Sequence, residues 1–299
     1  MRKPAALRRG DVIGVVAPAA AVDAAAVAAG VHALEALGFT VRLGAAVFRR
    51  DGYLAGGDQE RRDDLVAMLR DPEVKAIICA RGGYGSGRLL PLLDPSTVRQ
   101  HPKIIVGFSD LTYLLNDFVQ RAGLITFHGP MVVDIGEHPQ AAGRLTGLLT
   151  GDRHDWNLRA RAIIQPGTAE GVTAGGCLSA VVAMLGTPYE IETEGRLLLL
   201  EDANEKPFRI DRMLTQLRHA GMLEHVAGVI FGEMAGCSAH PNEAVTVRDV
   251  IAERFADANY PVVFGFPSGH GDGLATLPLG VRARLAGERL TLLESPVAD

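Results

Sequence analysis

Short apolar runs alternate with amphipathic segments along the first 135 residues of the chain. The apolar runs predict buried strands at residues 12–17, 40–43, 76–80 and 103–108. The segments between them predict helices at residues 23–37, 58–70 and 110–122, with a helical turn at 88–92. Strands separated by helices in this way indicate a parallel sheet that is covered by helices on both faces.

The pattern changes after Pro130. Residues 136–170 are polar and are interrupted by proline and glycine, so we interpret them as a linker or an exposed connection. Further apolar runs predict strands at residues 196–201, 226–231 and 262–264, a helix at 208–220 and a hairpin at 283–293. We therefore predict an α/β chain in three parts: a parallel-sheet domain at residues 1–135, the connection at 136–170 and a mixed α+β domain at 171–299.

The first residues allow a second interpretation. Basic side chains precede the apolar run at 12–17 and an alanine-rich stretch, which is the pattern of a signal peptide. Asp11 abuts the run, and Gly14 and Pro18 interrupt it, which favours a buried strand. Nowhere does the chain contain about 18 consecutive apolar residues, so we expect no membrane span.

Composition narrows the classes of function. The chain has 47% hydrophobic and 22% charged residues, which is typical of a globular protein. Its formal net charge of -5 argues against non-specific electrostatic binding to nucleic acid. The three cysteines are scattered and form no CxxC pair, which indicates neither a disulfide framework nor a zinc knuckle and fits a reducing cytosol.

The run from Lys103 to Thr112 carries the first candidate for chemistry. A buried strand leads directly into a helix here, with Ser109 at the turn. Such a serine projects from the C-terminal edge of the sheet, where helix amides favour a developing negative charge, as in a nucleophile elbow. The match to G-x-S-x-G is half complete, because Gly107 is present and Leu111 replaces the second glycine. A plain helix N-cap explains the local sequence equally well.

The second candidate is the glycine-rich stretch at residues 81–87, which directly follows the strand at 76–80. Its backbone could turn tightly and aim several N–H groups at one point, to hold a phosphate or an oxyanion. The spacing matches neither the P-loop nor the Rossmann fingerprint, so a nucleotide site is the weaker interpretation. The alternative interpretation is a structural turn in which glycine is needed to adopt positive φ.

A serine nucleophile needs a base, and the base needs a partner that orients it. His270 is the best placed of the nine histidines, because it lies in a glycine-flanked loop after an apolar strand. His128 is the competitor, for which a structural role is the simpler interpretation. Glu201 closes an apolar run, and a carboxylate at the end of a buried strand is costly unless it is paired. Its neighbours Asp202 and Glu205 are alternative acids.

Metal chemistry has little support in the sequence. There is no H-E-x-x-H motif, and His270 with Asp272 is too sparse to define a site. A dyad of Ser109 and Lys206 is conceivable and has less contextual support than Ser109 with His270. We therefore expect neither a metal nor an organic cofactor.

Five short motifs occur in order along the chain. They are Val15-Val-Ala-Pro18, Arg81-Gly-Gly-Tyr-Gly85, Gly107-Phe-Ser-Asp110, Leu200-Glu-Asp202 and Ser268-Gly-His-Gly271. Together and in this order they resemble the LD-carboxypeptidase family of serine peptidases, which includes muramoyltetrapeptide carboxypeptidases and microcin-C self-immunity peptidases. The resemblance covers nearly the whole chain and implies a flavodoxin-like N-terminal domain with a mixed α+β C-terminal domain.

The resemblance also assigns roles to residues. By position it makes Ser109 the nucleophile, Glu201 the acid and His270 the base of a catalytic triad. The backbone amides of Asp110 and of one glycine of the 82–83 pair, for which we favour Gly83, would form the oxyanion hole. The acid and the base would come from the C-terminal domain, and the nucleophile from the N-terminal one.

The implied activity is that of a serine LD-carboxypeptidase, which removes the terminal D-alanine from cytosolic murein tetrapeptides during cell-wall recycling. Recognition of a free carboxylate calls for a guanidinium. We therefore take Arg81 and its neighbour Tyr84 as candidate substrate-binding residues, with Arg209 as an alternative. The implied protein is a cytoplasmic homodimer whose partner is a small peptide, without nucleic acid or membrane.

Three alternatives stay open. A microcin-C-type enzyme would cleave peptidyl-adenylates, and Trp156 is the only tryptophan that could stack on a nucleobase. An esterase or amidase of the α/β-hydrolase type has the same order of serine, acid and histidine. A non-catalytic protein would use the glycine-rich loop and the helix start at Ser109 to hold an anion.

Overall fold

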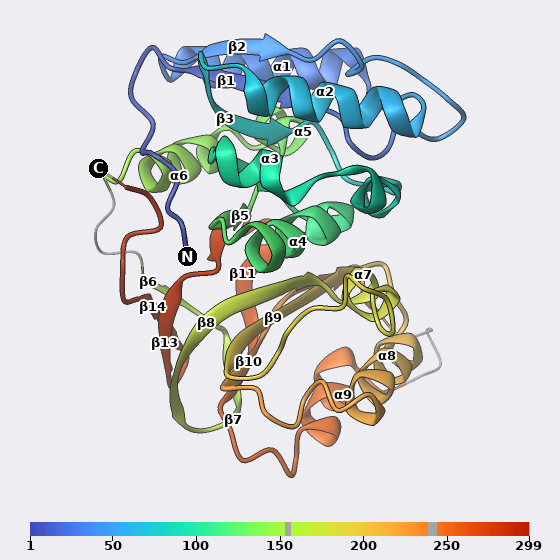
Figure 1. Cartoon of the computed structure of the whole chain (residues 1–299). Helices are drawn as coiled ribbons and strands as arrows, with labels where there is room; N and C mark the ends of the chain where they lie inside the picture. Colours follow the sequence, from blue (N-terminus) through green and yellow to red (C-terminus); the bar gives the residue numbers. More distant parts are fainter. Residues whose placement is uncertain (153–156, 239–243, 299) are drawn as a thin grey trace. The chain divides into compact units, whose positions relative to one another are not determined.

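A computed structural model describes residues 1–152, 157–238 and 244–298 of the chain (Figure 1). Contacts divide the chain into two compact units. The first holds residues 1–152, 275–280 and 295–298 of the described part, and the second holds the rest. Within the described residues, no helix is both long and apolar enough to span a membrane.

The first unit is built on a six-stranded sheet in the order β12-β5-β4-β3-β1-β2. Its strands are β1 (Val12–Val16), β2 (Thr40–Leu43), β3 (Val74–Cys79), β4 (Ile104–Gly107), β5 (Thr126–His128) and β12 (Leu277–Leu279). The first five are parallel and follow the flavodoxin-like order 2-1-3-4-5, while β12 pairs antiparallel with β5. The predicted parallel sheet is therefore confirmed.

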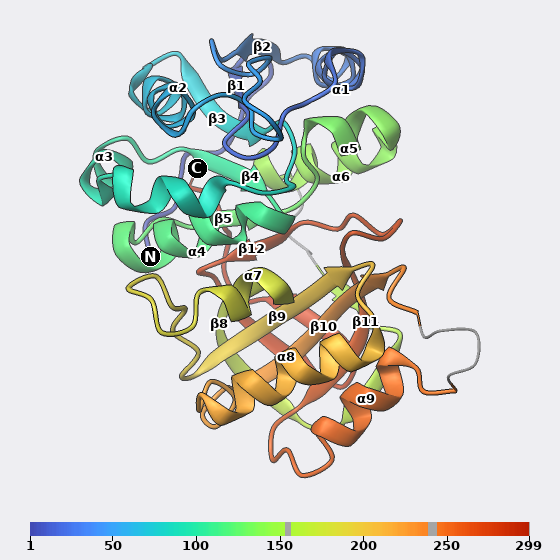
Figure 2. The same cartoon turned by 90° about the vertical axis from the view of Figure 1, so that its right-hand side faces the viewer.

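Helices cover both faces of this sheet (Figure 2). Figure 2 shows α1, α5 and α6 on one face and α2, α3 and α4 on the other. The helices are α1 (Ala24–Ala36), α2 (Asp58–Arg70), α3 (Pro95–Gln100), α4 (Thr112–Ala122), α5 (Val132–Glu137) and α6 (Pro139–Leu149), with 3-10 turns η1 (Ser86–Leu92) and η2 (Ser109–Leu111). Local signals fix their ends: Asp23 caps α1 by accepting from Ala26 N at 3.0 Å, and Gly123 ends α4 at φ 68°.

The segment that we expected to be a linker differs from that interpretation. Residues 136–149 include α6, and residues 157–170 include β6 (Asn157–Arg159), β7 (Ala162–Gln165) and the start of β8 (Thr168–Cys177). The buried positions of α6 follow a helical spacing and are Ala141, Ala142, Leu145, Thr146, Leu148 and Leu149. Half of that stripe is small or polar, so its periodicity is hidden in the sequence. Residues 153–156, Trp156 included, lie outside the described residues.

The second unit is built on an eight-stranded mixed sheet in the order β6-β14-β13-β8-β9-β10-β11-β7. The remaining strands are β9 (Arg196–Ala203), β10 (Gly228–Ala235), β11 (Val262–Gly269), β13 (Arg282–Ala286) and β14 (Arg289–Leu292). Strands β8 to β11 are parallel, and the predicted hairpin is formed by β13 and β14. The helices are α7 (Leu178–Ala183), α8 (Pro207–His219) and α9 (Val247–Arg254), of which α8 and α9 lie side by side in both views.

The N-terminal edge of the first sheet contains a buried cation. Lys103 precedes β4, is 7% exposed, and donates from Nζ to the carbonyls of Asp71 and, at 2.5 Å, Val74. Burial lowers the pKa of its ammonium from the ordinary 10.5 to about 8, a shift that the charge of Asp71 opposes and the charge of Lys75 supports.

We predict a pH-dependent contribution of Lys103 to stability. Between pH 8 and 10.5 the unfolded chain keeps the proton that the native state has lost, so the free energy of unfolding rises with pH in this window. Other groups titrate there too, and Lys103→Met isolates the effect. Denaturant titrations in phosphate-free buffer should show wild type gaining stability relative to the variant as pH rises. A difference that stays constant would contradict the assignment.

Candidate active site

Ser109 sits at a strained turn between β4 and α4. Its φ is 60°, in the left-handed region that a side chain disfavours, and it begins the 3-10 turn η2. Strain of this kind at the C-terminal end of a buried strand is the hallmark of a nucleophile elbow. An N-cap residue has extended φ and ψ, so the observed backbone favours the elbow over the plain cap.

The half-matched elbow motif has a packing explanation. A Cβ at Gly107 would lie 2.9 Å from Cγ of Leu111. Leu111 is fully buried, so its side chain fills the space that glycine leaves open two residues before the serine. Glycine at position 107 thus makes room for leucine at position 111 in the tight turn.

The glycine-rich loop after β3, residues 81–87, packs against the turn at Ser109. A Cβ at Gly82 would lie 2.9 Å from Cβ of Ser109 and 3.4 Å from the backbone nitrogen of Asp110. The carbonyl of Gly82 accepts from Ala20 N at 3.3 Å, and in a trans peptide the N–H of Gly83 points the opposite way. Among the described residues, this N–H has no acceptor. It is therefore available to a ligand beside Ser109.

Two buried side chains hold the loop in place. The carboxylate of Asp110 accepts from Ser86 N at 2.7 Å, and Ser86 Oγ donates to the Asp110 carbonyl at 2.6 Å. Arg61 is 1% exposed and donates to the Gly85 carbonyl at 2.9 Å and to the Pro18 carbonyl, while it forms an ion pair with Asp58. Arg61 was not among the predicted site residues, because a charged helix residue looks like a solvated one unless its burial is known.

The two candidate substrate-binding residues of this loop are exposed. Tyr84 is 53% exposed and packs edge to face on Tyr53, with ring centroids 5.9 Å apart. Arg81 donates from Nη1 to the Ala21 carbonyl at 3.3 Å. Both side chains are therefore accessible from solvent.

In the second unit, Glu201 and His270 form a close pair. Glu201 lies in β9 and is fully buried, whereas His270 directly follows β11 and its side chain is 24% exposed. Nδ1 of His270 is 2.6 Å from Oε2 of Glu201, and the backbone N–H of His270 donates to the same oxygen at 3.3 Å. Nδ1 therefore donates to the carboxylate, which leaves Nε2 of the neutral ring as a proton acceptor.

The pair needs glycine beside it. Gly269 has φ +118°, and a Cβ there would lie 2.5 Å from Oε2 of Glu201. A Cβ at Gly232 of β10 would lie 2.8 Å from Cβ of Glu201. Gly269 therefore lies against the carboxylate and Gly232 against the Cβ of Glu201, and neither position has room for a side chain.

A second buried carboxylate supports the loop that carries His270. Glu233, at the irregular end of the β10–β11 pairing, is 8% exposed and accepts from Gly273 N at 3.0 Å. Burial raises the pKa of its carboxyl, and it forms a 3.4 Å ion pair with Arg161. Glu233 was not predicted either, although it closes an apolar strand just as Glu201 does.

The alternative residues have other surroundings. His128 lies fully buried in β5, packed edge to face on Phe108 with centroids 5.8 Å apart, as expected of a structural histidine. Asp202 accepts from Ser179 N at 2.9 Å, and Lys206 donates to the Ser238 carbonyl at 3.4 Å. Arg209 of α8 forms an ion pair at 3.4 Å with Glu205, which precedes the helix. No cluster of three or more potential metal ligands occurs among the residues described.

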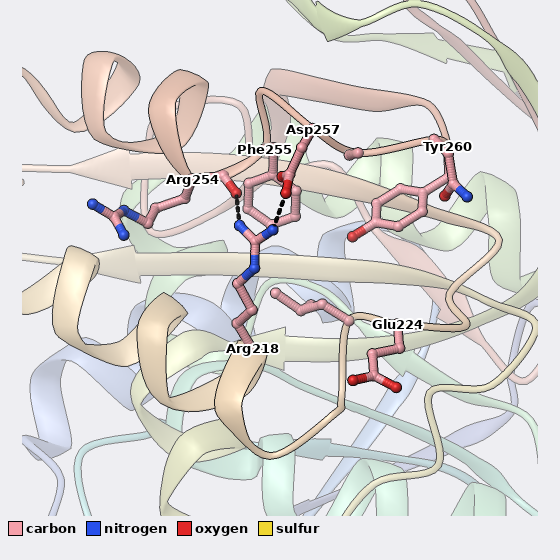
Figure 3. Close-up of a pocket in the computed structure, with 9 residues that line it drawn as sticks. Arg218, Glu224, Arg254, Phe255, Asp257 and Tyr260 are labelled. Carbon is pink, nitrogen blue, oxygen red and sulfur yellow. Dashed lines mark hydrogen bonds and ion pairs between the residues drawn. The ribbon is translucent and has the colours of Figure 1, made fainter.

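A cavity of about 300 Å³ in the second unit lies away from this chemistry (Figure 3). It is lined by residues that precede β10 and β11, whereas Glu201 and His270 lie at the C-terminal ends of their strands. Figure 3 shows Arg218 reaching across to Arg254 and Asp257, where it donates to the Arg254 carbonyl at 2.9 Å and pairs with the Asp257 carboxylate. Arg218 thereby links α8 to the end of α9.

The predicted site residues thus form two groups. Gly83, Ser109 and Asp110 belong to the first unit, and Glu201 and His270 belong to the second.

Two family models match the chain. The LD-carboxypeptidase N-terminal domain matches residues 13–129, and the LD-carboxypeptidase C-terminal domain matches residues 170–285. A probable murein peptide carboxypeptidase of Bacillus subtilis is 40% identical over 305 residues, which cover 99% of this chain and 96% of the relative. The chain belongs to the LD-carboxypeptidase family. The resemblance seen in the five motifs is confirmed.

Further relatives of this LD-carboxypeptidase family member agree. The murein tetrapeptide carboxypeptidase of Pseudomonas aeruginosa is 32% identical and covers 93% of this chain and 94% of its own. The crystal structure of the muramoyltetrapeptide carboxypeptidase of Oxalobacter formigenes matches with a TM-score of 0.85 at 26% identity, covering 96% of this chain and 100% of that one. The microcin C7 self-immunity protein MccF, at 24% identity and a TM-score of 0.92, covers all of both chains and shows the same fold.

Gly269→Ala should lower the peptidase activity of this family member by about 10²-fold, because the new methyl group displaces the Glu201 carboxylate that orients His270. Gly186→Ala is the control, since Gly186 also has positive φ, at +71°, and no atom lies within 4 Å of the position that its Cβ would take. Both variants bear backbone strain, but only the first has the clash. Steady-state kinetics with thermal melts would check this, and equal losses in the two variants would rule out the steric explanation.

Proposed function

We propose that this protein is a serine carboxypeptidase in which Ser109, Glu201 and His270 act as one catalytic triad. The observation that carries the proposal is the left-handed backbone of Ser109 at the end of β4 in a chain of this peptidase family. The 2.6 Å contact between Glu201 and His270 supplies the other two members with the geometry of an acid and a base.

The mechanism follows from the protonation pattern of the pair. Nε2 of His270 takes the proton of Ser109 Oγ as the serine attacks the scissile carbonyl, and Glu201 stabilises the imidazolium that forms. The histidine then returns the proton to the leaving amine. Water hydrolyses the acyl-enzyme by the same route in reverse, with His270 again as the base.

The developing oxyanion needs donors that are fixed before the reaction. We propose the N–H groups of Gly83 and Asp110 for this role. The Asp110 amide lies in the first turn after β4, where helix N–H groups lack intrahelical acceptors and favour negative charge. The Gly83 amide is oriented by the bond from Ala20 to the Gly82 carbonyl. Donors fixed in this way contribute several kcal/mol, about 3 kcal/mol each in comparable sites.

The proposed substrate is a murein tetrapeptide, from which the enzyme removes the terminal D-alanine in the cytoplasm as a step of cell-wall recycling. The names of the Bacillus and Pseudomonas relatives support this class of substrate. Arg81 and Tyr84 would contact the peptide, the guanidinium by pairing with its free carboxylate. The proposal includes a homodimer, as the family resemblance implies.

Peptidyl-adenylate cleavage is the second candidate. A 29% identical relative, which covers 93% of this chain and 91% of its own, is the microcin C7 self-immunity protein MccF of Escherichia coli. The two substrates differ in the group on the leaving side of the scissile bond: a D-amino acid in one and a nucleotide in the other. One assay can therefore compare them directly.

We expect Ser109→Ala to reduce hydrolysis at least about 10³-fold without loss of fold, because the acyl-enzyme can no longer form. Ser96→Ala, which removes an exposed hydroxyl bonded to Asp94, is the control. Mass spectrometry of products from a murein tetrapeptide, the tripeptide and processed microcin C would identify the substrate, with D-alanine release from the tetrapeptide alone expected. Near-full turnover by Ser109→Ala would remove the nucleophile assignment, and cleavage of microcin alone would favour the second candidate.

A further prediction concerns metal dependence. Prolonged dialysis against EDTA should leave full activity, because a serine nucleophile with a histidine base needs no Lewis acid. The value of kcat/KM should rise with pH as the His270 imidazole loses its proton, since the neutral ring is the base. Loss of activity on chelation, with specific recovery on adding zinc, would overturn the serine mechanism.

A further inference from the structure

A cavity of about 510 Å³ opens at the N-terminal edge of the sheet in the first unit. Three segments line it: the residues before β1, the turn from α2 to β3 and the residues before β4. Ser109 comes after β4 at the opposite edge, six residues beyond Lys103, which corresponds to about 20 Å of extended chain. The cavity is therefore separate from the proposed active site.

Lys103 lies at the base of this cavity and is its decisive feature. The side chain is nine-tenths buried, and two of its three N–H groups donate to the carbonyls of Asp71 and Val74. Within the described part of the chain, no carboxylate forms an ion pair with it. A buried ammonium that no carboxylate contacts directly is costly, and its third N–H is left for a ligand.

The other charges around the cavity add to this excess. Arg8, Arg70 and Lys75 are exposed cations that line it, and the charge of Lys75 is close enough to disfavour protonation of Lys103. Against these four cations stand two carboxylates. That of Asp71 is already paired with Arg42.

The second carboxylate, Asp11, accepts from the backbone N–H of Arg8 at 2.7 Å. His101 also lines the cavity. In the 300 Å³ cavity of the second unit, by contrast, Arg218 and Arg254 are both paired with carboxylates. The first cavity is thus the one in which positive charge is uncompensated.

We propose that this cavity binds a phosphate-bearing small molecule, with Lys103 under the phosphate and Arg8, Arg70 and Lys75 around it. A dianion balances the repelling ammonium groups of Lys75 and Lys103 at once, and cationic side chains of both types hold phosphate oxygens strongly. The volume exceeds that of a bare phosphate, and the apolar lining from Ala5, Pro72 and Pro102 can contact an organic group attached to it.

The test uses phenyl phosphate and inorganic phosphate on the full chain by isothermal titration calorimetry, with ionic strength held constant by sodium chloride. We expect saturable 1:1 binding, tighter for phenyl phosphate. Arg8→Ala and Lys75→Ala should each weaken binding about tenfold, whereas Arg50→Ala, an exposed cation of the same unit outside the cavity, should leave it unchanged. Equal weakening by Arg50→Ala, or no saturable heat, would overturn the proposal.

A chemical readout places the ligand at Lys103 itself. Acetylation of Lys103 by an amine-reactive ester at pH 8, followed by peptide mass spectrometry, should slow at least fivefold under saturating phenyl phosphate, while Lys3 stays reactive. Succinate at the same ionic strength should protect weakly. Equal protection by succinate would indicate a general anion site and overturn the assignment to phosphate. Unchanged labelling of Lys103 would show that the ligand lies elsewhere. Neither readout depends on peptidase activity.

Discussion

The burial of one carboxylate governs the second unit. Glu201 is fully enclosed, and a charge in that position is tolerated only if donors face it. His270 supplies two of them, from its backbone and from its ring, on the same oxygen. To let that loop approach, β11 ends in a glycine at φ +118°, and β10 carries Gly232 beside Cβ of Glu201 and the carbonyl of Ser268. The glycine turn, the irregular β10–β11 pairing and the orientation of the imidazole all accommodate the same buried charge.

The first unit meets a different requirement, which is to hold the strained turn at Ser109 in place. Ser109 is kept in a strained conformation by the packing of Leu111 over Gly107 and by the loop that Gly82 brings beside it. Arg61 and Asp110 hold that loop in place through hydrogen bonds to its backbone. Buried charged side chains bond to the loop here because its backbone carbonyls and amides have no partners in a helix or a sheet. The geometry of the turn thus depends on contacts made by buried residues.

Much of the fold could be predicted from sequence, because strong local signals coincide with tertiary ones. Helix α2 and strand β2 lie at their predicted bounds, since charge, caps and apolar spacing agree there. Helix α6 was not predicted because alanine and threonine share its buried face with leucine. Glu201 was found from its place at the end of an apolar run, and Glu233 could have been found by the same signal. The burial of Arg61 and the pairing of β12 with β5 could not be predicted, because neither leaves a signal in the local sequence.

The return of β12 to the first unit has a consequence for how the chain acquires its structure. Strand β5 ends at residue 128, and its antiparallel neighbour β12 begins at residue 277, so the chain leaves the first unit and comes back to complete its sheet. During synthesis from the N-terminus, β5 is an open edge with unpaired backbone groups until almost the whole chain has emerged. The second sheet also needs β13 and β14, which follow β12 in the chain, so neither sheet is complete until nearly all residues have been made. The two units are therefore interlocked in the order in which their strands occur along the chain.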